Sequence, residues 1–156
     1  MLKLTSLEFI ARTIPESFIY IFAGYVFSDR KLNVNRYLIA SLLLAVSTFI
    51  IRMLPINYGV HTILFIIIQT TILASINKID VIQSVKSAII AVIFLLIFEG
   101  INMLILNLTF KDELESIMLN PISKIIYGFP SLGGFAIIVL CYYYLRKKAK
   151  YKYDEN

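Results

Sequence analysis

The segment from Lys86 to Leu108 most constrains what this chain can fold into. It is an almost unbroken apolar run that carries a single acidic residue, Glu99. A helix of about 20 apolar residues matches the roughly 30 Å hydrocarbon core of a bilayer. An ionisable side chain inside such a span is costly unless other groups or water receive it. The segment therefore predicts a membrane-spanning helix whose acid meets partners from other helices.

The composition of the 156-residue chain extends this prediction to the whole molecule. Hydrophobic residues make up 59% of it and charged residues only 16%, which is too apolar for a soluble domain to cover. We therefore expect an all-α integral membrane bundle over residues 1–145, followed by a basic tail at 146–156. Hydropathy predicts five transmembrane helices, at about 7–27, 37–54, 61–79, 85–108 and 125–145.

Two connections carry further structural signals. The stretch from Phe110 to Lys124 has apolar residues on one helical face and acids on the other, so it is either a short interfacial helix ending near Pro121 or a solvated acidic loop. Glycines and a proline interrupt the start of the fifth span and allow an irregular backbone there. These residues are Gly128, Pro130, Gly133 and Gly134.

Basic residues indicate how the bundle is oriented. With five spans and the C-terminus inside, ten of the fifteen Lys and Arg residues fall on the inner side. The positive-inside rule therefore predicts an N-terminus outside and a C-terminus inside. The inner residues are Arg30, Lys31, Arg36, Lys78, Lys86, Arg146, Lys147, Lys148, Lys150 and Lys152.

With this orientation, the strongly polar groups within the spans all lie in the outer half. They are Arg12, Glu16, Arg52, His61, Glu99 and Asn102. We expect them to form an outward-opening ligand pocket, and a structural ion-pair network or a proton relay are the alternatives. Arg12 and Glu16, four residues apart, could also pair within their own helix, and Pro15 predicts a kink beside them.

Helical periodicity predicts which side of the fourth span faces the bundle. A stripe near the direction of Glu99 holds several small residues, which favour close helix packing. We expect this stripe to face the other helices and the opposite side to face lipid. Its members are Ser84, Ala88, Val92, Leu95, Asn102 and Met103.

Several functional classes are disfavoured. His61 is the single histidine and has no acid or cysteine at ligand spacing, so no metal site is expected, and one cysteine, Cys141, excludes an internal disulfide. The chain has no nucleophile elbow, phosphate loop or HExxH motif. Its net charge of +5 is concentrated at helix ends, which suits membrane orientation rather than nucleic acid. We expect a protein that is not an enzyme and holds no cofactor.

Several segments carry a resemblance to a known family. IARTIPESFIYIFAGY, IIRMLPINYGVHTILFIII, NKID, FEGINMLIL and IIYGFPSLGG follow one another before a basic tail. In this order they resemble the N-terminal membrane sensor region of clostridial histidine kinases related to the AgrC quorum-sensing receptors. The resemblance implies a ligand-sensing module whose last helix passes a signal to cytoplasmic kinase domains. No histidine follows His61 and no glycine-rich nucleotide segment is present, so we expect no autophosphorylation.

We therefore expect a non-enzymatic sensor in the cell membrane of a Gram-positive bacterium. It would bind membrane lipid and an extracellular or membrane ligand, either a peptide or a small molecule, and would signal through a cytoplasmic or membrane partner or as a homodimer. A transport-related subunit, an immunity-type membrane protein and a structural scaffold remain the alternatives.

Overall fold

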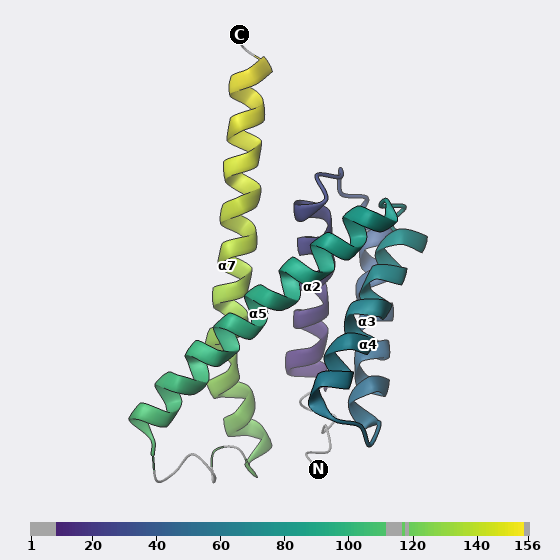
Figure 1. Ribbon diagram of the computed structural model, residues 1–156. Coiled ribbons are helices and arrows are strands. Elements are labelled where there is room, and N and C mark those ends of the chain that lie inside the picture. Colours follow the sequence, from purple (N-terminus) through teal and green to yellow (C-terminus); the bar gives the residue numbers. More distant parts are fainter. Residues whose placement is uncertain (1–8, 112–116, 118, 155–156) are drawn as a thin grey trace.

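Helices connected by short turns make up the chain within residues 9–111, 117 and 119–154, which are the residues that the computed structural model describes (Figure 1). A π-helix, η1 (Phe9–Thr13), leads directly into the first α-helix. The α-helices are α2 (Ile14–Phe27), α3 (Val34–Met53), α4 (Tyr58–Ser75), α5 (Val81–Thr109) and α7 (Pro121–Asp154). Consecutive α-helices run in alternating directions, so the start of α2 and the end of α7 lie at opposite ends of the bundle.

Three of the described helical segments are long and apolar enough to cross a membrane. They are Val34–Met53, Val81–Thr109 and Ile122–Lys148, and Gly59–Ser75 is a shorter apolar helix. Many large apolar side chains on these helices are exposed, among them Ile63, Ile93 and Ile137. Such surfaces are stable in contact with lipid tails rather than water. The helices therefore indicate a multi-pass membrane protein.

The short helix α2 occupies the centre of the bundle and contacts α3, α4, α5 and α7. Its residues Tyr20, Ile21 and Tyr25 are almost completely buried. Gly24 allows α4 to approach closely, because a Cβ atom there would lie 2.6 Å from a methyl group of Leu73. The other helices are thus arranged around the one that follows η1.

Short polar side chains begin three of the helices. The Asn33 side chain accepts a hydrogen bond from the Arg36 backbone, and Asp80 and Asn120 act in the same way before α5 and α7. These caps satisfy backbone N–H groups that have no partner within the helix. At the other end, α4 stops at Ser75, before the predicted residue 79, because the chain turns through Lys78 with φ of 57°.

The expectation that glycines and a proline interrupt the start of the fifth span is wrong, because α7 is continuous from Pro121 to Asp154. Pro130 removes only one N–H donor from a long helix, and no described glycine has a positive φ. Pro121 starts this helix, at the position where proline is favoured. The proposed interfacial helix lies largely at residues 112–116 and 118, outside the described part of the chain, and the basic tail continues α7 as far as Asp154.

The packing prediction for α5 is confirmed over its first half. Ser84, Ala88, Val92 and Leu95 are buried, as the predicted stripe requires. Met103 is 43% exposed, so the prediction is wrong there. The reason is that the second half of α5 diverges from α3 and α4 and crosses α7 (Figure 1).

Two neighbouring glycines of α7 test this crossing. A Cβ atom at Gly134 would lie 2.6 Å from the Phe98 ring of α5, whereas one at Gly133 would meet no atom within 4 Å. We expect Gly134→Ala to lower the free energy of unfolding by about 1–3 kcal/mol through overpacking. Gly133→Ala should leave it unchanged or raise it by up to about 1 kcal/mol, because alanine favours the helix. Thermal unfolding in detergent measures both, and equal stability of the two variants would contradict close α5–α7 packing.

Candidate functional site

Arg12 lies in η1, the π-helical turn that precedes α2. Pro15, the second residue of α2, has no N–H group to bond the Ala11 carbonyl, which disturbs regular α-helical winding at this point. A π-helix places about one more residue in each turn than an α-helix does. Arg12 therefore lies on a locally widened turn directly before α2.

The Arg12 guanidinium forms an ion pair with Glu99 of α5. Its Nη2 atom donates a hydrogen bond to Oε1 of the carboxylate, and the two side chains are 22% and 25% exposed. The same guanidinium lies against Gly128 of α7, where a Cβ atom would come within 3.0 Å of Nη1. Arg12 thus contacts both helices that cross at this end of the bundle.

A second ion pair joins α2 to α3. Nη2 of Arg52, in the last turn of α3, lies 3.3 Å from Oε2 of Glu16, whose side chain is only 7% exposed. The expectation that Arg12 and Glu16 pair within one helix is therefore wrong. Each of them instead pairs with a residue from another helix.

The two ion pairs form one group, which we call the charge cluster: Arg12, Glu16, Arg52 and Glu99. Glu99 lies within electrostatic range of the other three residues. Two guanidinium groups and two carboxylates make the cluster neutral overall. Neutrality matters because an isolated charge in an apolar interior is far more costly than a paired one.

Asn102 and His61, the other predicted site residues, take no part in these ion pairs. The Asn102 side chain donates a 2.7 Å hydrogen bond to the Tyr127 carbonyl and so fastens α5 to α7. His61 lies in the first turn of α4. Among the described residues its buried Nδ1 atom has no hydrogen-bond partner, and no ion pair or hydrogen bond joins it to the charge cluster.

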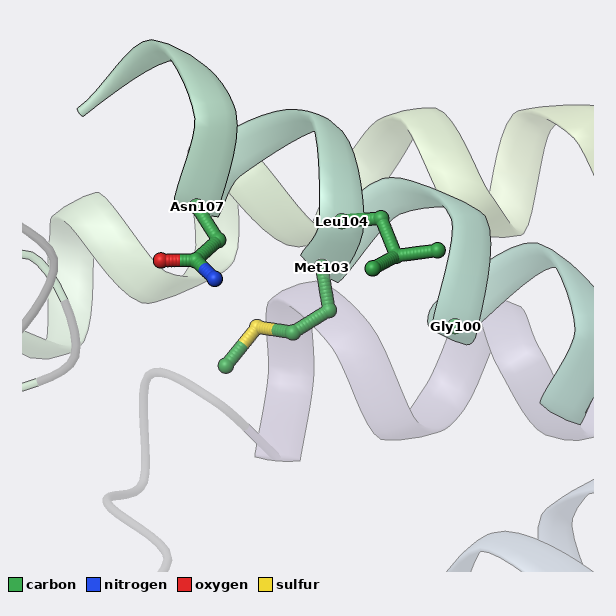
Figure 2. Close-up of a pocket in the computed structure, with 4 residues that line it drawn as sticks. All are labelled: Gly100, Met103, Leu104 and Asn107. Atoms are coloured by element: carbon green, nitrogen blue, oxygen red, sulfur yellow. The ribbon is translucent and has the colours of Figure 1, made fainter. Parts of the chain in front are cut away.

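The structure adds a feature that the sequence analysis missed. An open hollow of about 430 Å³ lies on α5 and is lined by Gly100, Met103, Leu104 and Asn107. In Figure 2 the Met103 and Asn107 side chains project from the same side of the helix. Gly100 directly follows Glu99, and a small residue at that place in an apolar span is the signal that could have indicated the hollow.

Two further findings limit what this site can be. Within the described ranges, no group of three or more His, Cys, Asp or Glu side chains could hold a metal ion. Comparison with protein-family models, curated proteins and solved structures finds no match to this chain. The function must therefore be argued from the charge cluster and its surroundings.

Two asparagines of α5 test the contact that fastens α5 to α7. Asn102→Ala should lower the free energy of unfolding by about 1 kcal/mol, because the Tyr127 carbonyl loses its donor in a partly buried setting. Asn107→Ala, on the exposed side of the same helix, is the matched control and should change it by less than about 0.5 kcal/mol. Thermal unfolding in detergent compares them, and an equal loss in both variants would rule out a specific role for Asn102.

Proposed function

We propose that this chain is a non-enzymatic membrane sensor module that binds an apolar ligand bearing a carboxylate beside Arg12. The observation that carries the proposal is the position of Arg12, which pairs with α5, lies against α7 and keeps hydrogen-bonding capacity to spare. A ligand that takes up this capacity would act on both helices at once.

The spare capacity follows from the chemistry of the guanidinium group. Arginine has five N–H donors in a planar fork that suits a carboxylate. Among the described residues, the hydrogen bond from Nη2 to Glu99 is the one that Arg12 donates. About a fifth of the Arg12 side chain is exposed, so an incoming carboxylate can reach the remaining donors.

The hollow on α5 supports an apolar body for the ligand. Met103 follows Glu99 by four residues and therefore lies close to it on the helix surface. Met103 and Leu104 give the hollow an apolar lining, and Gly100 leaves room between them and Glu99. A chain of methylene groups or an apolar peptide side chain fits this lining better than a sugar or a nucleotide.

Helix α7 is the element that we propose transmits the signal. Gly128 brings α7 into contact with the Arg12 guanidinium, so a change of partner at Arg12 alters what α7 packs against. Signalling is then a shift of α7 that favours one of two arrangements, read by a partner protein or by a second copy of this chain. The predicted orientation, with Arg12 in the outer half, and the resemblance to AgrC-related sensor regions agree with this role.

A structural scaffold is the strongest rival, because within each ion pair the two charges already neutralise each other. Transport-related and immunity-type roles would use the same cluster for a substrate or a partner. The scaffold needs no ligand, so a binding experiment separates it from the proposed sensor.

Tryptophan fluorescence can test the proposal, because the sequence contains no tryptophan. Met103→Trp places one reporter in the hollow, and Ile137→Trp places a control on an exposed face of α7. In discs of zwitterionic lipid, decanoate at alkaline pH should saturably change the emission of the reporter in the hollow and leave that of the control unchanged. Decanol, which has the same chain but no charge, should bind at least tenfold more weakly, because it cannot form the carboxylate–guanidinium pair.

Replacing both members of the ion pair provides the key control. Arg12→Gln together with Glu99→Gln keeps the site neutral while removing the guanidinium, and should abolish the preference for decanoate over decanol. Melting temperatures confirm that the variants remain folded. If decanoate and decanol bind equally, or if the preference survives in the double variant, the proposed site is wrong, and no saturable change at all would favour the scaffold.

A further inference from the structure

The end of the bundle farthest from η1 carries cations from segments that are distant in the sequence. Asp29, just after α2, and Arg146, near the end of α7, form an ion pair with Oδ1 and Nη1 3.2 Å apart. Nη1 of Arg146 also lies 3.4 Å from the Val26 carbonyl at the end of α2. We call these two contacts of Arg146 the bridge. The bridge brings the loop between α2 and α3 to the same level as the basic part of α7.

The bridge depends on an unusual backbone conformation. Asp29 has a φ of 56°, in the left-handed region where glycine is the usual residue after a helix. A glycine could not offer a carboxylate to Arg146. The Arg146 guanidinium also lies 5.5 Å from the centre of the Tyr142 ring, which further fixes its position.

Around the bridge lie five exposed cations, which we call the basic end surface: Arg30, Lys31, Arg36, Lys147 and Lys148. In the described part of the chain, none of the five has an acidic partner. Two acids at this end are already engaged, since Asp29 pairs with Arg146 and Asp80 caps α5. Among the side chains that the structure describes, the surface therefore has an excess of positive charge.

At the opposite end of the bundle, Arg12 and Arg52 each have a carboxylate partner within the protein. Lys111 is also exposed at that end. The ends therefore differ mainly in the number of exposed cations that separate segments contribute. Unpaired cations at one end call for an anionic partner from outside the chain.

The neighbours of these cations indicate which anion that is. Leu32, Val34 and Leu145 lie among them in the sequence and are 42%, 58% and 68% exposed. Such apolar side chains face lipid tails in a bilayer, so the cations beside them lie at the level of the lipid phosphates. The exposed side chains of Tyr142, Tyr143 and Tyr144 are also typical of this interface.

We propose that the basic end surface binds the headgroup of an anionic phospholipid, with the α2–α3 loop and α7 contributing cations to one site. The charge excess and its position beside lipid-facing residues both favour a lipid over an acidic protein. This inference does not depend on the ligand proposed beside Arg12. It assigns a second site, at the other end of the bundle.

Native mass spectrometry of the full chain in non-ionic detergent tests the proposal. Phosphatidylglycerol and phosphatidylcholine with identical acyl chains are titrated separately, and the first should bind more tightly. Arg30→Gln and Lys147→Gln should each weaken phosphatidylglycerol binding by about fivefold, the effect of one cation near an anionic surface. If both cations contact one lipid, the variant with both changes should bind that lipid with an affinity reduced by the product of the two single effects.

The matched control is Lys111→Gln, which removes an exposed cation outside the basic end surface and should change binding less than about twofold. Glycerol phosphate as a soluble competitor distinguishes a site for the free phosphate group from one that needs the lipid. Displacement of the lipid at similar concentrations would show that the free phosphate suffices. The proposal would be overturned if the two lipids bound equally, or if Lys111→Gln weakened binding as much as Arg30→Gln and Lys147→Gln do. It would also be overturned if each single variant lost a different bound lipid.

Discussion

The rest of the structure depends on neutralising the charges that flank and begin the central helix α2. Arg12 and Glu16 enter the bundle on η1 and α2, where solvent cannot reach them freely. Each then requires a partner of opposite charge, because an unpaired ion in an apolar interior costs several kcal/mol. The partners come from α5 and α3, and these two contacts fix where both helices pass α2.

This requirement also explains the crossing of α5 and α7. Glu99 must reach Arg12, so the second half of α5 leaves α4 and lies across α7. Gly134 allows the close approach of Phe98 that the crossing demands, Gly128 leaves room for the Arg12 guanidinium, and Asn102 fastens α5 to α7 by bonding the Tyr127 carbonyl. A ligand at Arg12 would therefore act where three helical segments meet.

The sequence predicted the helical class and much of the packing, because apolar runs and their periodicity directly reflect burial. It predicted that Glu99 needs partners, and the buried stripe from Ser84 to Leu95 is as expected. It could not give the pairing of Arg12 with Glu99, because that contact joins segments far apart in the sequence and depends on how α5 packs across the start of the described chain. The continuity of α7 through Pro130 was missed because proline and glycine preferences are weaker than helix packing.

The central claim is that the Arg12–Glu99 ion pair couples the start of the chain to α5, and a double-mutant cycle tests it most directly. The free energy of unfolding is measured in detergent for Arg12→Gln, Glu99→Gln and the variant with both changes. The pair predicts that the double variant loses less stability than the two single losses combined, with a coupling of about 1–3 kcal/mol. Losses that simply add would contradict the claim, because they would show that the two side chains act independently.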